Sequence, residues 1–219
     1  MLRLQSVKET LPPGVELVAV SKFHPAELIR QAYDEGQRVF GESRVQELQA
    51  KRPQLPSDVE WHFIGHLQLN KVKYIAPYVS LIHAADSLKL LQEINRQAAK
   101  CDRCIDCLLE LHVAQESTKF GMKPEECERM LTGGEWKTLS RVRIRGLMCM
   151  ATNTDDETQV RRDFQTANAF FQHLKETYFP TNPDFDLRSW GMTHDYRIAI
   201  EEGANMVRIG TAIFGEREY

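Results

Sequence analysis

Lys22 ends a short apolar stretch that reads Leu17-Val18-Ala19-Val20-Ser21-Lys22. The apolar run predicts a strand buried on both faces, and Pro25 suits the first position of a following helix. Lys22 is therefore expected at the carboxyl end of a buried strand, where α/β folds bind ligands. Because burial disfavours the ammonium form, we expect the pKa of Lys22 to fall and its amine to attack aldehydes. The alternative is structural: a lysine that reaches solvent or pairs with a carboxylate.

Two later segments carry residue types that bind phosphate. Ser189 and Thr193 offer hydroxyl groups, and a helix expected to begin near Asp195 offers backbone N–H groups at the positive end of its dipole. Gly210 allows a ligand to approach the backbone closely, and Thr211 adds another hydroxyl. The structural alternative is that these residues cap helices and relieve crowding. Together, and facing a strand-end lysine, they favour a phosphate site.

Arg208 lies between two apolar residues of the last apolar run, so its side chain points to the opposite face of a strand from theirs. It could form an ion pair inside the protein with Asp106 or Glu110. Alternatively, it donates to a heteroatom of a ligand. An aldehyde bound to a lysine, a phosphate on two loops and a donor to a ring nitrogen together describe pyridoxal phosphate.

Apolar runs alternate with segments of helical spacing along the whole chain. The runs occupy residues 17–20, 39–41, 61–65, 79–84, 105–113, 142–150, 187–192 and 206–214. Strands that alternate with helices indicate a parallel sheet, and eight strands close a (β/α)8 TIM-type barrel. The rival is an open, doubly wound sheet, but its G-x-G-x-x-G fingerprint is missing after the first run. We therefore predict an α/β barrel of parallel strands.

Helix ends are marked by short polar or glycine signals. Gly36 ends the first helical stripe, Ser87 precedes the second, and the acidic segment 154–157 precedes the longest. The chain ends at Tyr219, which we expect leaves no room for a helix after the eighth strand. We predict that an N-terminal helix covers that gap, with its apolar side formed by Leu2, Leu4, Val7 and Leu11.

Composition restricts the classes of function. The 219 residues carry a net charge of -3, which gives no electrostatic reason to expect nucleic acid or an anionic membrane as partner. No apolar stretch is long enough to span a bilayer, and the first residues do not form a signal peptide. We expect a cytoplasmic protein with reduced cysteines. Residues 1–219 are expected to form a single domain, and the protein is expected to be a monomer.

Several motifs spread over the chain carry a resemblance to a known family. They read VAVSK at 18–22, FGE at 40–42, WHFIG at 61–65, LQ and NK at 67–71, SWGM at 189–192 and MVRIGTAIFG at 206–215. The chain resembles the pyridoxal phosphate homeostasis protein family, which is similar to the N-terminal barrel of alanine racemase. The resemblance implies that Lys22 holds pyridoxal phosphate as a Schiff base. It also implies a cofactor-binding set made of Lys22, Ser189, Met192, Thr193, Arg208, Gly210 and Thr211.

The chain departs from the family pattern at a few positions. Ser43 and Arg44 stand where the family usually has Asn and Tyr, which removes a possible contact with the cofactor or its lysine. Thr193 replaces a usual Ser and keeps the hydroxyl, and Trp190 stands where Met is common.

The resemblance implies a carrier without established catalysis, which buffers pyridoxal phosphate or delivers it to enzymes that accept it. Racemisation needs a second acid or base opposite the lysine, which alanine racemase takes from a second domain. We expect none here, and an arginine beside the ring nitrogen weakens the ring as an electron sink. The first alternative, a weak racemase or a related enzyme that uses pyridoxal phosphate, would need a base from His62, His66, His83 or Tyr196. The second alternative is a metal or redox site at Cys101, Cys104 and Cys107, although a second cysteine pair is missing.

Overall fold

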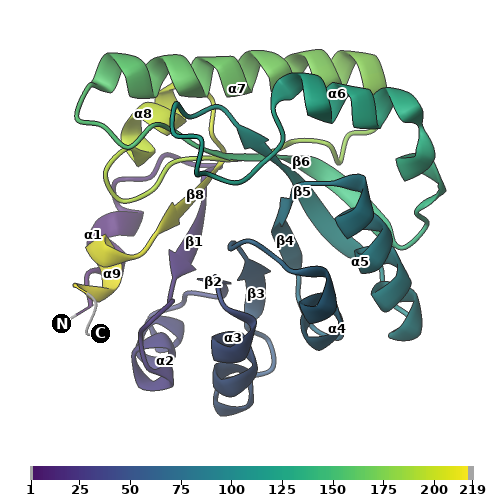
Figure 1. Ribbon diagram of the computed structural model, residues 1–219. Coiled ribbons are helices and arrows are strands. Elements are labelled where there is room, and N and C mark those ends of the chain that lie inside the picture. Colours follow the sequence, from purple (N-terminus) through teal and green to yellow (C-terminus); the bar gives the residue numbers. More distant parts are fainter. Residues whose placement is uncertain (1, 217–219) are drawn as a thin grey trace.

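The computed structural model describes residues 2–216 and shows a closed barrel of parallel strands surrounded by helices (Figure 1). Neighbouring strands follow sequence order from the first to the eighth, and the eighth pairs with the first. The strands are β1 (Glu16–Val20), β2 (Val39–Glu42), β3 (Glu60–Phe63), β4 (Leu81–Ala85), β5 (Ile105–His112), β6 (Val142–Met150), β7 (Leu187–Ser189) and β8 (Met206–Ile209). The predicted TIM-type barrel is confirmed.

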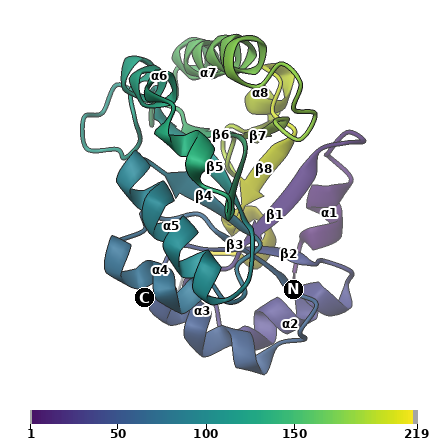
Figure 2. The same cartoon turned by 90° about the vertical axis from the view of Figure 1, so that its right-hand side faces the viewer.

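Helices connect successive strands and cover the outside of the barrel (Figure 2). They are α1 (Leu4–Lys8), α2 (Ala26–Asp34), α3 (Val45–Lys51), α4 (Val72–Ile75), α5 (Leu88–Lys100), α6 (Pro124–Gly133), α7 (Glu157–Tyr178), α8 (Tyr196–Glu201) and α9 (Thr211–Phe214). The capping signals act as expected at two of them. Ser87 Oγ accepts the Leu90 N–H at the start of α5, and Asp156 accepts the Thr158 N–H at the start of α7.

The strands are apolar because both of their faces are buried. One apolar cluster fills the space between strands and helices, with Ile29, Phe63 and Phe164 among its members. A smaller cluster lies on the inner face of the barrel and includes Val18 and Met148. Polar side chains share that interior, which a core built only for stability would exclude.

The region after β8 differs from the prediction. The expectation that no helix follows the last strand is wrong, because Thr211–Phe214 forms the short helix α9. The N-terminal helix does lie beside it, as expected: the Arg3 N–H donates to the Ile213 carbonyl at 3.1 Å. The apolar runs also overstated β7 and β8, which end at Ser189 and Ile209. The residues that follow β7 leave the sheet and form a loop, whereas those that follow β8 enter α9 directly after Gly210.

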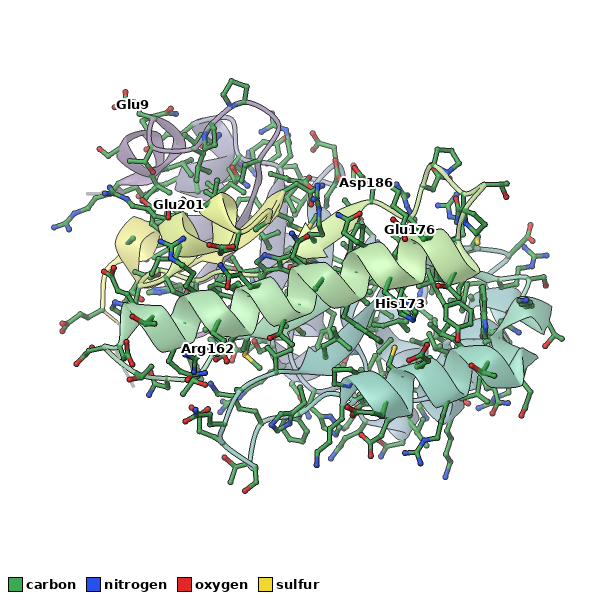
Figure 3. All side chains as sticks on the ribbon, turned by 90° about the horizontal axis from the view of Figure 1, so that it is seen from above. Glu9, Arg162, His173, Glu176, Asp186 and Glu201 are labelled. Carbon is green, nitrogen blue, oxygen red and sulfur yellow. The ribbon has the colours of Figure 1, made fainter. Side chains whose placement is uncertain are left out.

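The long helix α7 shows how one face of each helix is buried and the other solvated. Phe164 and Phe171 are buried against the barrel. Arg162, His173 and Glu176 lie on the exposed face seen from above (Figure 3). Among residues 2–216, no helix combines the length and the apolar composition that crossing a bilayer requires.

Candidate functional site

A cavity of about 200 Å³ opens at the carboxyl end of the barrel strands. It brings together residues from both ends of the chain, because closure of the barrel pairs β1 with β8. Of the predicted cofactor-binding residues, all except Ser189 line it: Lys22, Met192, Thr193, Arg208, Gly210 and Thr211. Lys22 lies two residues after the end of β1 and is half-buried, at the strand end where the sequence predicted it. The lowered pKa expected for Lys22 stays a prediction.

The two loops predicted to bind phosphate meet at this cavity. Within the described part of the chain, the hydroxyl groups of Thr193 and Thr211 form no hydrogen bond, so both are available to a ligand. The expected helix N–H groups are less available, because the Asp195 and Tyr196 N–H groups donate to the Met192 carbonyl at 3.2 and 2.9 Å. The hydroxyl groups, rather than the start of α8, are therefore the donors that this loop offers.

Gly191 determines where the loop after β7 turns. Its φ is +93°, a left-handed conformation that favours glycine. A Cβ atom there would lie 2.6 Å from the Ala199 Cβ of α8, so the close packing of loop against helix needs a residue without a side chain. This packing places Met192 and Thr193 at the cavity.

Arg208 is a buried residue of β8 whose side chain lines the cavity. Its guanidinium donates to the carbonyl and to Oγ of Ser189, the latter at 2.7 Å, and to the Cys149 carbonyl at 2.9 Å. Among the described residues its Nε–H has no acceptor, which leaves a donor for a ligand atom. The predicted ion pair with Asp106 is not formed, since that carboxylate binds Arg143 and Arg145.

Ser189 is fully buried and lies beneath the cavity rather than in its wall. Besides Arg208, its Oγ contacts His83 Nδ1 at 3.0 Å, and His83 Nε2 lies 3.1 Å from His62 Nδ1. This chain of polar groups crosses the barrel interior from β8 to β3. Ser189 thus holds the guanidinium in place, and a direct contact with phosphate stays a prediction.

The four side chains considered as bases are buried or bonded to other side chains. Burial lowers the pKa of His62 to about 3 and that of His83 well below its usual value. His66 pairs with Asp86 at 3.3 Å, and the Tyr196 hydroxyl contacts Thr10 at 2.9 Å. None of the four lines the cavity.

The lining also includes residues outside the predicted cofactor-binding set. Ser43 lies in the cavity wall, so the replacement of the family's usual Asn falls at the site. Met148 and Met150 also line it, and their spacing of two residues in one apolar run could have indicated a shared face. Gly65 lets the loops after β2 and β3 approach, since a Cβ there would lie 2.4 Å from the Ser43 carbonyl.

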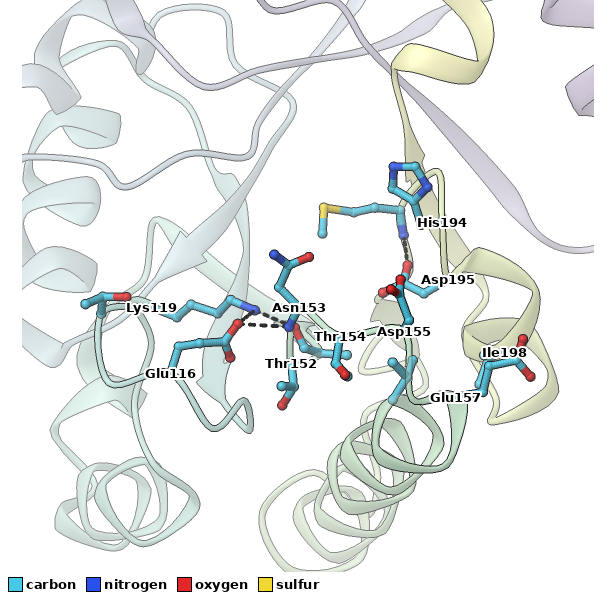
Figure 4. A pocket seen from close by; sticks show the side chains of 14 residues that line it. Glu116, Lys119, Thr152, Asn153, Thr154, Asp155, Glu157, His194, Asp195 and Ile198 are labelled. Atoms are coloured by element: carbon cyan, nitrogen blue, oxygen red, sulfur yellow. Dashed lines mark hydrogen bonds and ion pairs between the residues drawn. The ribbon is translucent and has the colours of Figure 1, made fainter.

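A second cavity, of about 560 Å³, lies beside the first and shares Met192 and His194 with it (Figure 4). Four carboxylates line it: Glu116, Asp155, Glu157 and Asp195. Its one lysine, Lys119, pairs with Glu116 at 3.0 Å and donates to the Ala151 carbonyl. Asp195 accepts the Met192 N–H at 2.6 Å. The excess of carboxylates gives this cavity an acidic character.

None of the five cysteines is among the lining residues of either cavity. Cys107 is buried in β5, and burial raises its pKa, whereas Cys101 and Cys104 are half-buried. In the part of the chain that the structure describes, no group of three or more His, Cys, Asp or Glu side chains could hold a metal ion.

The barrel, with a lysine at the end of its first strand and an arginine in its last, defines a class of protein. The family described as alanine racemase, N-terminal domain, matches residues 3–218. An alanine racemase from Clostridium difficile shares this fold, with a TM-score of 0.77 and 15% identity over 99% of this chain and 55% of its own.

Within this class, the chain belongs to the pyridoxal phosphate homeostasis protein family. The Aquifex aeolicus member is 41% identical over 222 residues, which cover 99% of this chain and 95% of its own. The Escherichia coli member is 36% identical over 215 residues, 95% and 88% of the two chains. PipY from Synechococcus elongatus, also 36% identical, superimposes with a TM-score of 0.90 without PLP and 0.87 with PLP bound, over 97% of this chain and 98% of PipY.

Proposed function

We propose that this chain binds pyridoxal phosphate beside Lys22, holds it as a Schiff base on that lysine, and buffers it or delivers it to enzymes that need it. The observation that carries the proposal is the shared cavity, which joins an amine, a buried guanidinium and two threonine hydroxyls. PipY, which was solved with PLP bound, supports the same assignment. Pyridoxal phosphate supplies an aldehyde that condenses with a primary amine and releases water.

Each residue has a separate task in this proposal. Lys22 supplies the amine, and the hydroxyl groups of Thr193 and Thr211 donate to the phosphate, which Gly210 lets approach the backbone. Arg208 faces the ring nitrogen and opposes its protonation. Ser189 acts through Arg208 by accepting hydrogen bonds from its guanidinium.

We infer that release occurs by exchange of the Schiff base to an incoming amine. The acidic cavity of Figure 4 supports this, because its carboxylates attract an ammonium group next to the proposed cofactor site. The incoming amine belongs to an amino acid or to the lysine of an acceptor enzyme. All of these groups come from one chain, which supports a monomer that acts as one domain. We propose that it acts in the cytoplasm.

We infer binding without catalysis, because the candidate bases are buried or engaged elsewhere. His194 is the histidine in the cavity wall, so it is the residue through which catalysis would operate. Deuterium exchange at the α-carbon of alanine, measured with the loaded protein and with His194→Gln, tests this point. If the wild type accelerates this exchange and His194→Gln does not, the protein is a weak enzyme and the proposal of a carrier without catalysis is wrong.

The binding proposal is tested by absorption spectra of wild type and Lys22→Ala with pyridoxal phosphate, followed by borohydride reduction and peptide mapping. We expect a Schiff-base band in wild type only, with the reduced adduct on the Lys22 peptide. The matched control is Lys175→Ala, which removes a half-buried lysine paired with Asp186 at 3.1 Å. A band that survives in Lys22→Ala, or no band in wild type, would refute the assignment.

A further inference from the structure

A cluster of three ionisable side chains, two of them buried, lies next to the strand end that carries Lys22. Lys51, the last residue of α3, donates to Glu42 at 2.7 Å and to Glu47 at 2.9 Å. Lys51 is 8% exposed and Glu42 is fully buried. Because desolvation offsets most of the attraction in a buried ion pair, stability alone does not explain such a cluster.

The cluster is hydrogen bonded to the residue before Lys22. The third bond of Lys51 goes to the Ser21 carbonyl at 2.9 Å, and Ser21 Oγ donates to Glu42 at 2.7 Å. Ser21 is fully buried. The end of β1 is therefore joined to β2 and α3 through side chains, beyond the ordinary bonds of the sheet.

The cluster is also hydrogen bonded to the residue after Lys22. Glu47 accepts the Phe23 N–H at 2.8 Å with the same carboxylate oxygen that accepts from Lys51. Phe23 has a φ of +67°, which is unfavourable for a residue with a side chain. Such a conformation persists only where surrounding contacts hold it. The backbone on both sides of Lys22 is thus tied to one ammonium group.

We propose that Lys51 is a positioning residue for Lys22, which holds the backbone of 21–23 so that the Lys22 amine meets the aldehyde of a ligand in the cavity. A lysine side chain is long and flexible, so the position of its backbone decides where the amine can reach. This inference rests on the proposed function, because it assumes that Lys22 reacts with the aldehyde. It predicts that Lys51 affects bond formation and not the binding of the rest of the ligand.

Two ligands separate these effects. Pyridoxal phosphate can form the bond, whereas deoxypyridoxine phosphate carries a methyl group in place of the aldehyde and can only bind noncovalently. Since small misplacements of reacting groups are costly, we expect Lys51→Met to weaken binding of pyridoxal phosphate about 10- to 100-fold and to change binding of the analogue less than about twofold. Borohydride trapping on the Lys22 peptide should fall in parallel. The control Lys175→Met, which removes a lysine of α7 that pairs with Asp186, should change neither affinity.

Lys51→Met leaves Glu42 buried without its partner and can prevent folding. The double variant Glu42→Gln/Lys51→Met removes that charge while still losing the bond to the Ser21 carbonyl, and we expect it to show the same selective loss. Equal weakening of both ligands would show a general loosening of the cavity and overturn the positioning role, as would wild-type behaviour with both. If wild type itself forms no adduct on Lys22, the proposed function fails and this inference fails with it. If wild type forms the adduct on Lys22 but the Lys51 variants show no selective loss of pyridoxal phosphate binding, only the positioning role is refuted.

Discussion

Replacing Glu110 with glutamine should stabilise the protein in neutral and mildly alkaline solution. Glu110 lies in β5 with 3% of its surface exposed, and its Oε2 has no hydrogen-bond partner among the described residues. Burial raises the pKa of this carboxyl group from about 4.5 to about 7. The charge of Asp86 also raises this pKa and that of Arg208 lowers it, and the value of about 7 includes both charges.

The sign of the effect follows from proton binding. Glu110 binds its proton more tightly in the folded state, so the free energy of unfolding falls as the pH rises from about 4.5 to about 7. The difference between these two pKa values corresponds to a loss of roughly 3 kcal/mol above that window. Glutamine resembles the protonated acid in shape and does not titrate. The stability advantage of Glu110→Gln should therefore grow by about 3 kcal/mol across the window, or roughly 6–12 °C in Tm for a chain of this size.

The assay is denaturant unfolding of both proteins at about pH 4.5 and about pH 8, read by circular dichroism. The control Glu176→Gln changes an exposed acid on α7 and should give a constant difference from wild type (Figure 3). If the wild-type and Glu110→Gln stabilities remain parallel over this range, Glu110 is not held neutral by burial and the reasoning is refuted.

Two further predictions concern the sheet and the interior histidines. Gly146→Ala should destabilise the protein by about 3 kcal/mol, because a Cβ there would lie 1.8 Å from the Leu187 carbonyl oxygen. The control Gly133→Ala, whose Cβ would have no atom within 4 Å, should leave stability unchanged. Equal melting temperatures of the two variants would contradict this prediction. Since burial lowers the pKa of His62 from 6.5 to about 3, the fold loses stability as the pH falls through that interval. Between about pH 7 and pH 5, the free energy of unfolding of His62→Gln should therefore fall by about 2 kcal/mol less than that of wild type. Equal pH dependence of the two proteins over this range would contradict the prediction.

Local patterns accounted for the strands and for much of the site. Buried parallel strands are almost continuously apolar, so their positions, and the place of Lys22 after the first of them, could be read from neighbouring residues alone. Strand ends after β7 and β8 were misjudged, because Trp190 and Ile213 are apolar for reasons of packing outside the sheet. The apolar character of a residue does not by itself show whether it belongs to a strand, a helix or a loop.

The sequence by itself determined the barrel, the strand-end lysine and the residue types able to hold a phosphorylated aldehyde, because these depend on short-range pattern and family motifs. The tertiary structure decided the partners. Ser189 lies beneath the cavity and accepts a hydrogen bond from Arg208, which lines it. Lys51 donates to the Ser21 carbonyl across thirty positions of the chain. Such contacts arise only when the barrel closes and brings distant strand ends together. No local pattern specifies which buried groups then meet.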